Sequence, residues 1–319
     1  MNAEANSTVS SFSSASLAER AYRSTQISWT GLRVWLHYQT LSWWDKFCGR
    51  DPDARDLHAV HQKNADLIFR TAVSLRGMLV KMCQVIGTRS DIFPREYVSV
   101  LSQCQDRLPA REFESIRRVV EEDLGKPIES VFAEFETKPV AAASLAQVHR
   151  AQLVTGENVA VKVQYPDIEH IMHTDLTASR RIAALYAKFS DNPIDFLPLL
   201  DELQTHLRME LDFRREVQSA DRVRDFFAHD RDVRVPRVFE AFSTRRIITM
   251  EFVAGAKPND LTELHAAGID TQGFMLRLMR IFNRMILAHG FFHADPHPGN
   301  FLLNEKGNMG IIDFGCVKE

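Results

Sequence analysis

Residues 293–315 read HADPHPGNFLLNEKGNMGIIDFG and place two acids and one amide at a distinctive spacing. Asp295 and Asn300 stand five residues apart, and Asp313 follows Asn300 by thirteen residues. Apolar residues flank Lys306-Gly307-Asn308, which predicts a hairpin that turns there. Two isoleucines precede Asp313, so we expect this acid at the end of a buried strand, one hairpin after Asn300.

Together with Lys162, these residues match what phosphoryl transfer from ATP requires. Lys162 stands in the predicted strand VAVKV and would pair with the α- and β-phosphates. Asp295 would accept a hydroxyl proton or orient the nucleophile, while Asn300 and Asp313 would bind a metal ion. Protein kinases carry such a lysine, an HRDxxxxN loop and a DFG segment in this order. A lysine in an exposed strand is common, so the order and spacing of all the segments carry the prediction.

The segment PVAAASLAQVHRAQLVTGENVAVKVQ, residues 139–164, predicts two strands joined by a turn. When the valine of the kinase glycine loop, GxGxxGxV, is aligned with Val148, each of its glycines becomes an alanine. Because alanine carries a methyl group, we expect a stiffer loop over the phosphates. Ser144 and Gln147 would hydrogen-bond to phosphate or to other parts of the protein. The residues expected at the nucleotide are Ala141, Ala142, Ala143 and Ser144. The alternative is a turn of small residues with no role in nucleotide binding.

A carboxylate is needed to hold Lys162, and the candidates lie in MELDFRREVQ, residues 209–218. Glu216 follows Lys162 by 54 residues, which predicts an insertion of about one helical hairpin between them. Glu210 and Glu216 are six residues apart on a predicted helix, so they cannot face the same way. One of them should meet Lys162. The alternative for these acids is a solvated helix face.

The composition limits the classes of partner. The chain has 319 residues, 45% of them hydrophobic, and a net charge of −3. It has no basic excess to neutralise phosphates, so we exclude nucleic acid as the main partner. Its four cysteines form no CxxC pair, which favours a reducing compartment. No apolar run is long enough to span a bilayer as a helix.

Two features of the first fifty residues leave alternatives open. The Ser- and Ala-rich residues 1–24 predict a flexible tail, with a transit peptide as the alternative. All four tryptophans stand between Trp29 and Trp44. Clustered tryptophan is typical of a helix at a membrane interface. The alternative is a helix that packs on the rest of the protein through these aromatic rings.

Three histidines suggest a zinc site as a rival to the kinase interpretation. His289, His293 and His297 stand four residues apart, which on a helix would form one face. Pro296 and Pro298 forbid a helix there, so we expect His293 to fix the loop.

The quoted segments, with ELDFRREV and KMCQVIGTRSDIFPREYVSVLSQCQDRLP, resemble the UbiB/AarF-type atypical kinases, which support ubiquinone biosynthesis. The likeness runs from about Leu75 to Glu319. It implies an α+β, protein-kinase-like two-lobe fold with an N-terminal helical extension. The expected segments are residues 1–56, a tail and interfacial helix; 57–130, the KxGQ-type extension; 131–255, an N-lobe with a helical insertion; and 256–319, the start of the C-lobe.

The resemblance also implies roles for individual residues. The catalytic residues would be Asp295, Lys162 and Glu216, and the metal ligands Asn300 and Asp313. Met250 would be the gatekeeper, and Glu251 and Val253 would offer backbone groups to adenine. Lys81 and Gln84 would be the KxGQ lysine and glutamine, on a segment thought to cover a protein-substrate site. Glu210 and Asp212 would be the ExD acids.

The sequence departs from the family pattern at two places. Cys83 replaces the KxGQ glycine, which puts the close packing of that helix in doubt. The chain also ends six residues after Asp313, so we expect a truncated C-terminal lobe, either in a fragment or in a shortened, non-catalytic product.

The function implied is that of an atypical kinase or ATPase that binds ATP or ADP with Mg²⁺. Its expected partners are the nucleotide, a quinone-precursor lipid or quinone-biosynthesis proteins, and a membrane surface. The expected location is peripheral, on the cytoplasmic face of a bacterial inner membrane or on the mitochondrial inner membrane, with a soluble cytoplasmic protein as the alternative. The alternative functions are a small-molecule phosphotransferase of the aminoglycoside- or choline-kinase type and a non-catalytic nucleotide- or lipid-binding module.

Overall fold

The computed structural model describes residues 11–48, 54–105, 110–189, 195–266, 268–269, 272–304 and 307–319. Contacts divide the chain into two units. One combines Met1–Pro109, Ala143–Leu145 and Asp167–Thr205, and the other combines Ala110–Ala142, Ala146–Pro166 and His206–Glu319. The boundaries of these units differ from those of the four segments expected from the sequence. The reason is that Asp167–Thr205, most of the insertion before Glu216, groups with the N-terminal helices.

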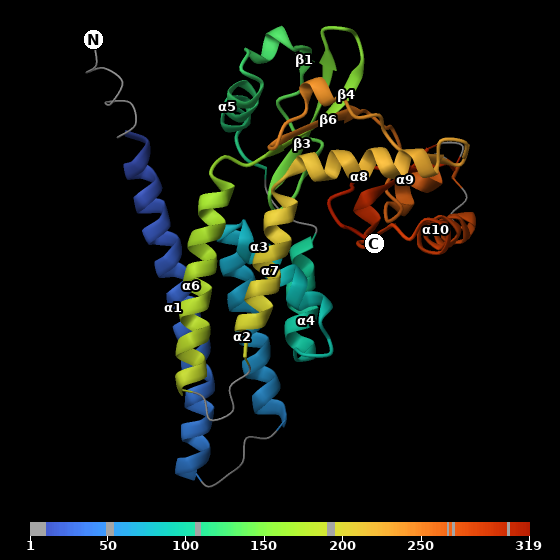
Figure 1. Ribbon diagram of the computed structural model, residues 1–319. Helices are drawn as coiled ribbons and strands as arrows, with labels where there is room; N and C mark the ends of the chain where they lie inside the picture. The colour runs from blue at the N-terminus through green and yellow to red at the C-terminus, as the bar shows by residue number, and fades with distance from the viewer. Residues whose placement is uncertain are drawn as a thin grey trace, which may run out of the picture. The chain divides into compact units, whose positions relative to one another are not determined.

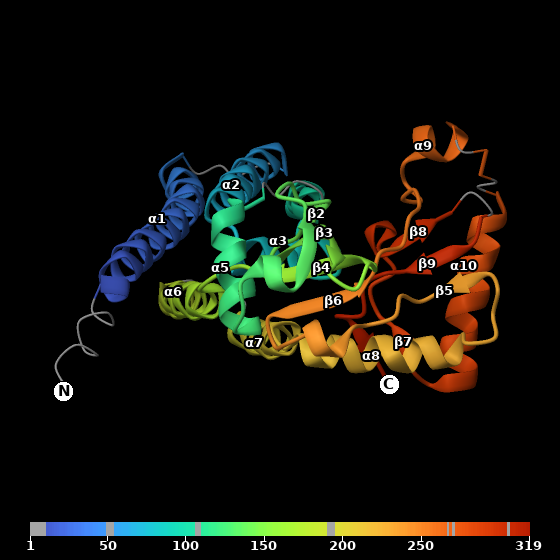
Figure 2. The ribbon, with the colours of Figure 1, turned by 90° about the horizontal axis from the view of Figure 1, so that it is seen from above.

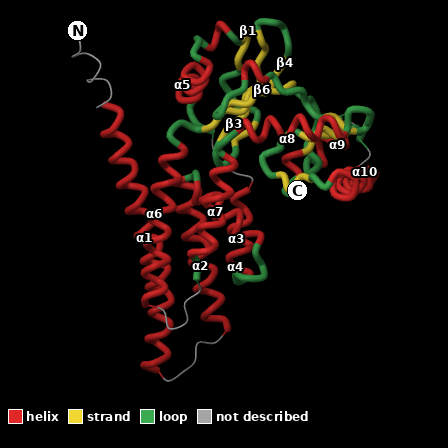
Figure 3. Tube along the Cα trace, viewed as in Figure 1, coloured by secondary structure: helices red, strands yellow, loops and turns green. Residues whose placement is uncertain are grey.

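The first unit is helical in the part of it that the structure describes (Figures 1 and 3). Its helices are α1 (Ser11–Cys48), α2 (Ala54–Leu75), α3 (Met78–Thr88), α4 (Arg95–Leu101), the short 3-10 helix η1 (Ser102–Gln105), α6 (Ile168–Phe189) and the greater part of α7 (Leu197–Glu210). A flexible tail was expected up to residue 24, but α1 begins at Ser11, and residues 1–10 lie outside the description. The difference arises because α1 packs along α6.

A buried ion pair ties three helices of this unit together. Arg23 of α1 donates to both carboxylate oxygens of Asp175 on α6, at 2.9 and 2.6 Å. The same guanidinium donates to the backbone carbonyls of Leu75 and Arg76, where α2 ends. Burial raises the pKa of Asp175 more than Arg23 lowers it, so desolvation of the pair is expensive.

The second unit contains the main sheet (Figure 2). Its strands run in the order β1-β3-β4-β6, with β2 paired to β3, and all of these pairs are antiparallel. The elements of this part are α5 (Phe113–Leu124), η2 (Ile128–Ser130), β1 (Phe132–Phe135), β2 (Ala141–Ala142), β3 (Ala146–Leu153), β4 (Asn158–Gln164), α8 (Phe213–Phe226), η3 (Glu240–Phe242) and β6 (Ile247–Glu251). The strands β3 and β4 are joined by a turn that contains Gly156, so the predicted pair of strands is confirmed.

The rest of this unit holds two small sheets, β5-β9-β8 and β10-β7. Its elements are β5 (Val233–Arg234), α9 (Leu261–Ala266), α10 (Gln272–Arg284), a π-helical turn η4 (Met285–His289), β7 (Phe292–His293), η5 (Pro298–Asn300), β8 (Phe301–Leu303), β9 (Met309–Ile311) and β10 (Val317–Lys318). Gly290 ends the helical run with a φ of 60°, as expected of a C-terminal glycine. The predicted hairpin is β8–β9, which brings Ile311 opposite Phe301.

The ion pair of the first unit makes a prediction about stability. Replacing Asp175 with asparagine should lower the free energy of unfolding by about 3 kcal/mol or more, because Arg23 stays buried without its counter-charge. Urea unfolding of the full chain measures this. The matched control is Asp201→Asn, which removes an exposed pair with Arg180 and should lower it by less than about 1 kcal/mol. Equal losses in the two variants would contradict the importance of the buried pair.

Candidate active site

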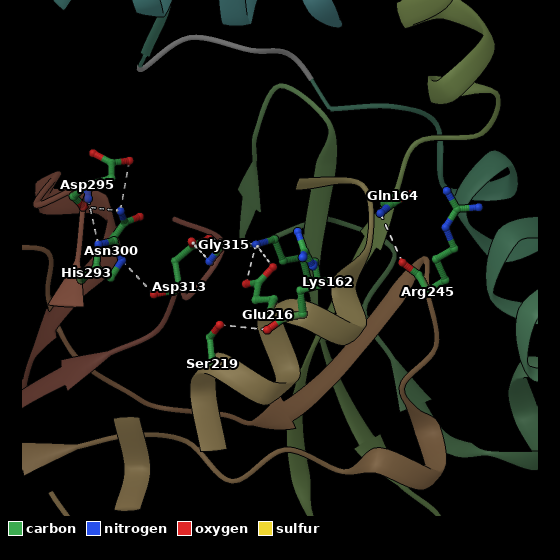
Figure 4. Close-up of polar contacts among 11 residues, drawn as sticks. Lys162, Gln164, Glu216, Ser219, Arg245, His293, Asp295, Asn300, Asp313 and Gly315 are labelled. Atoms are coloured by element: carbon green, nitrogen blue, oxygen red, sulfur yellow. Dashed lines mark hydrogen bonds and ion pairs between the residues drawn. The ribbon is translucent and has the colours of Figure 1, made fainter. Parts of the chain in front are cut away.

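A cluster of three charged side chains, Lys162, Glu216 and Asp313, lies in the second unit (Figure 4). Lys162 lies in mid-sheet, between Val148 of β3 and Ile248 of β6. Its ammonium donates to both carboxylate oxygens of Glu216, at 2.7 and 2.9 Å, and to Asp313 Oδ2 at 2.8 Å. The expected contact between Lys162 and Glu216 is therefore present, and Asp313 joins it.

In this cluster, burial and the attraction between opposite charges shift each pKa in opposite directions. Burial lowers the pKa of Lys162, but Asp313 and Glu216 outweigh it and leave this pKa above its ordinary value. Burial raises the pKa of Asp313, yet Lys162 brings it down to about 2. Burial holds the pKa of Glu216 above its ordinary value, and the charge of Asp313 adds to this. Two carboxylates thus share one ammonium, and a cation beside Asp313 would relieve their repulsion.

Helix α8 carries Glu216 and is fixed at its first turn. The side chain of Asp212 caps the helix by accepting from the N–H of Arg214 at 3.2 Å. The N–H of Phe213 donates to the carbonyl of Arg245 at 3.0 Å. The buried amide of Gln164, at the end of β4, donates to the carbonyl of Leu211 at 2.8 Å. The Gln164 bond joins the start of α8 to the strand that carries Lys162, and the Phe213 bond joins it to the segment before β6.

The loop with Asp295 is held by His293, as expected from the sequence. His293 is buried, and its Nδ1 accepts from the N–H of Asp295 at 3.1 Å. Its Nε2 lies 2.9 Å from the carbonyl oxygen of Asp313 and donates to it. Asn300 Nδ2 donates to the carbonyl of Asp295 at 3.0 Å. The side chain of Asp295 itself is exposed, where a substrate hydroxyl could reach it.

The oxygens of this site suit a hard divalent cation. Asp313 Oδ1 accepts from the N–H of Gly315 at 3.0 Å, which fixes the carboxylate. Because Asn300 uses its Nδ2 for Asp295, its Oδ1 is left as an acceptor. The side chain of Asp313 is 33% exposed, against 4% for Glu216, so it is the accessible acid of the cluster. Carboxylate and amide oxygens are the ligands that Mg²⁺ prefers.

The alanine-rich loop forms a tight hairpin. Ala141 and Ala142 make β2 and pair with Val148 and Gln147 of β3. Among the described residues, only Arg76 and Asp167 have a positive φ without being glycine. Ala143 and the neighbouring Ser144 at the turn therefore need no left-handed backbone, so the alanines cause no strain.

Gln147 has a structural role instead of a phosphate contact. Its Oε1 accepts from the N–H of Arg111 at 2.8 Å, and its Nε2 lies 2.8 Å from Nε2 of His149. The other ring nitrogen of His149 lies 2.7 Å from the carbonyl of Glu136. Gln147 and His149 are both fully buried. Of the two alternatives for Gln147, hydrogen bonding to the protein is the one observed.

The expected hinge follows β6. Met250 is buried in the sheet, and Glu251 ends the strand. The N–H groups of Glu251 and Phe252 already donate to the carbonyls of Arg237 and Asn158. A cavity of about 250 Å³ adjoins this segment. It is lined by Arg234, Phe252, Val253, Ala254, Leu302, Asn304, Asn308 and Gly310.

The remaining motif residues lie as follows. Lys81 and Gln84 are on α3, and Gln84 Nε2 is 3.4 Å from the carbonyl oxygen of Cys104. Glu210 is the last residue of α7, and Asp212 caps α8. The histidines of the zinc alternative have separate partners: His289 stacks on Phe226, His293 binds Asp313, and His297 accepts from Gly299. These partners contradict a zinc site.

Sequence reasoning missed Gln164 and the second partner of Lys162. Gln164 follows two residues after Lys162, but a glutamine at a strand end gives no signal of its carbonyl partners. Asp313 was expected only as a metal ligand, and its contact with Lys162 spans 151 residues. The lining residue Leu302 also gave no signal, because it reads as an ordinary strand leucine.

Comparison with known proteins decides the family. Residues 103–319 match the ABC1 atypical kinase-like domain. The chain belongs to this family. It is 39% identical over 261 residues to the chloroplastic protein ACTIVITY OF BC1 COMPLEX KINASE 7 of Arabidopsis thaliana, covering 81% of this chain and 37% of that protein. It is 35% identical over 265 residues to mouse AarF domain-containing protein kinase 1, covering 81% of this chain and 50% of that protein.

A solved structure supports the same family and fold. The complex of Rv3197 with erythromycin from Mycobacterium tuberculosis aligns with a TM-score of 0.55 and 28% identity, covering 83% of this chain and 68% of that chain. The expected UbiB/AarF resemblance and the kinase-like α+β fold are confirmed. The ABC1 family supports phosphotransferase-type chemistry at a coarse level. The chain spans half or less of the length of the two curated relatives described above.

The low pKa of Asp313 predicts how stability depends on pH. An unfolded aspartate has a pKa near 3.9, so the stabilisation from Asp313 should be complete above about pH 4 and lost as the pH falls through about 2. Because this side chain is partly exposed, we expect Asp313→Asn to lower the free energy of unfolding by about 1–2 kcal/mol at pH 7. The loss should shrink at pH 3. Urea unfolding at both pH values tests this, and a loss that does not change with pH would contradict it.

Proposed function

We propose that this chain binds Mg²⁺ and ATP or ADP and acts as an atypical kinase or ATPase. The observation that carries the proposal is the ammonium of Lys162 shared between Glu216 and Asp313. An ordinary structural ion pair needs one carboxylate, whereas a second, accessible acid beside the lysine suits a bound metal–phosphate group. Family membership supports the same chemistry. It also favours an atypical kinase over a small-molecule phosphotransferase of another family.

In this proposal each residue has a defined task. Lys162 orients the α- and β-phosphates while Glu216 holds the lysine in place. Asn300 and Asp313 hold Mg²⁺, which neutralises developing phosphate charge when it is bound. Asp295 accepts the proton of the attacking hydroxyl or water. The alanine hairpin with Ser144 covers the phosphates. Met250 is the gatekeeper, and Glu251 and Val253 receive adenine.

We also propose that the protein supports isoprenoid quinone biosynthesis at a membrane surface, with a quinone-precursor lipid or quinone-biosynthesis proteins as partners. The resemblance to UbiB/AarF proteins motivates this. None of the described helices is both long and apolar enough to cross a membrane. The attachment proposed from the resemblance is peripheral, on the cytoplasmic face of a bacterial inner membrane or on the mitochondrial inner membrane.

Helix α1 supplies a surface suited to that attachment. Tyr22, Trp29, Leu36 and Trp43 stand at seven-residue intervals, close to two helical turns, and so share one stripe. Each is 42–65% exposed. Tryptophan and tyrosine prefer the boundary between headgroups and acyl chains. A different part of α1 packs inward, where Trp35 meets Phe189 of α6 edge to face.

Nucleotide binding tests the main proposal. Asp313→Asn should weaken binding of a fluorescent ATP analogue at least tenfold in the presence of Mg²⁺, because a metal ligand is lost. Asp221→Asn, which alters a surface pair with Arg224 on α8, is the matched control and should bind like the parent. Binding that is equally tight in Asp313→Asn, or that does not depend on Mg²⁺ in the parent, would argue against the proposal.

Sedimentation with liposomes tests the α1 stripe. The double substitution Trp29→Ser/Trp43→Ser should reduce the bound fraction about tenfold, because two interfacial rings are removed. The control is Met275→Ser/Leu276→Ser on α10, two apolar side chains that are also exposed, and it should bind like the parent. If both double variants bind equally well, α1 is not the membrane contact.

A further inference from the structure

Helix α3 and the short helix η1 pack against each other in direct contact in the first unit. A Cβ built on Gly87 of α3 would lie 2.7 Å from the backbone nitrogen of Ser102 and 2.8 Å from its Cα. Such distances are too short for a side chain, so the two backbones touch at this point. One turn earlier, Cys83 occupies the same face of α3 as Gly87, four residues away.

Cys83 meets Cys104 of η1 at this contact. Both cysteines belong to one hydrophobic cluster, with exposures of 1% and 2%, and each thiol shifts the pKa of the other. The neighbouring Gln84 approaches the carbonyl oxygen of Cys104, at 3.4 Å. Both cysteines are free thiols in the structure. A disulfide requires the two Cβ atoms to lie about 4 Å apart. The close approach of the two backbones at Gly87, one turn away, allows Cys83 and Cys104 to reach this separation.

The two thiols are not equivalent. The interaction with Cys83 lowers the pKa of the Cys104 thiol, while the interaction with Cys104, together with burial, raises the pKa of the Cys83 thiol. The thiolate is the reactive form of cysteine, so Cys104 is the expected nucleophile and Cys83 the resolving partner.

We propose that Cys83 and Cys104 form a redox-active pair that closes into a disulfide across α3 and η1. The oxidant is hydrogen peroxide. The Cys104 thiolate attacks one peroxide oxygen; the O–O bond breaks, a sulfenic acid forms, and the released hydroxide takes the proton that Cys104 lost and becomes water. The Cys83 sulfur then attacks the Cys104 sulfur, the S–O bond breaks, and the departing hydroxide takes the Cys83 proton as a second water. Two electrons pass from the thiols to the peroxide.

The disulfide acts on the helix that carries Lys81 and Gln84. In the reduced chain α3 meets η1 through the packing of the two thiols in one apolar cluster and through the close backbone approach at Gly87. In the oxidised chain the same helix is covalently fixed to residue 104, which restricts its freedom to separate from η1. Cys83 stands where the KxGQ pattern has glycine, so the pair includes a residue at which this sequence departs from that pattern. The inference does not depend on nucleotide binding.

The direct test uses the unaltered chain. After brief treatment with hydrogen peroxide, remaining thiols are alkylated in denaturant and the digest is analysed by mass spectrometry. We expect a crosslinked peptide pair containing Cys83 and Cys104, its loss on treatment with dithiothreitol, and an upward shift in melting temperature before reduction. Recovery of both residues as alkylated thiols, at a peroxide dose that oxidises the more exposed Cys316, would overturn the proposal.

Two variants test the order of attack. With the resolving thiol removed in Cys83→Ala, dimedone should label Cys104 as a trapped sulfenic acid. In Cys104→Ala, labelling of Cys83 should be at least tenfold lower. Cys316→Ser is the matched control and should form the same disulfide as the parent. Equal labelling of Cys83 and Cys104 in the two alanine variants would overturn the assignment of Cys104 as nucleophile.

Discussion

The arrangement of the second unit depends on one interaction: the ammonium of Lys162 binds the carboxylates of both Glu216 and Asp313. Lys162 comes from the middle of the main sheet, Glu216 from α8, and Asp313 from the segment after β9. The ammonium also lies over the ring of Phe213, 5.1 Å from its centre, which gives it an apolar support. Because an unpaired charge at this depth would be costly, strand, helix and loop must all stay in place for the cluster to be stable. The charges therefore position the same residues that phosphoryl transfer would use.

The absence of glycine from the alanine-rich loop has a simple backbone explanation. Glycines are needed in a loop where the backbone adopts left-handed conformations. The hairpin of β2 and β3 has no residue in such a conformation, so it does not need glycine. Fixing this hairpin takes additional buried polar contacts, which Gln147 and His149 supply to the backbone of Arg111 and Glu136. These contacts add to the expectation of a stiff loop, because they fix the strand β3 from which the loop emerges.

Much of the site could be predicted because its signals are short in sequence. The five-residue step from Asp295 to Asn300 and the hairpin before Asp313 are local patterns, and local patterns fix local geometry. Contacts between distant segments gave no such signal. Arg23 and Asp175 are 152 residues apart, and nothing in either neighbourhood distinguishes them from surface charges. For the same reason the sequence did not predict that α6 groups with α1 or that Cys83 packs near Cys104. In a sequence, a buried cysteine cannot be told from any other small apolar residue.

Asp212, one of the two expected ExD acids, has a structural role at the start of α8. Asp212 is its N-cap, and Glu216 follows one turn later, so the cap sets where the helix begins and hence where the Glu216 carboxylate points. The preceding residue, Leu211, is held by the buried amide of Gln164 at the end of the strand that carries Lys162. A shift of the helix start by one residue would rotate Glu216 by about 100° away from the ammonium. The cap and the strand-end amide thus fix the register between α8 and β4, and the lysine–glutamate contact is the consequence of that register.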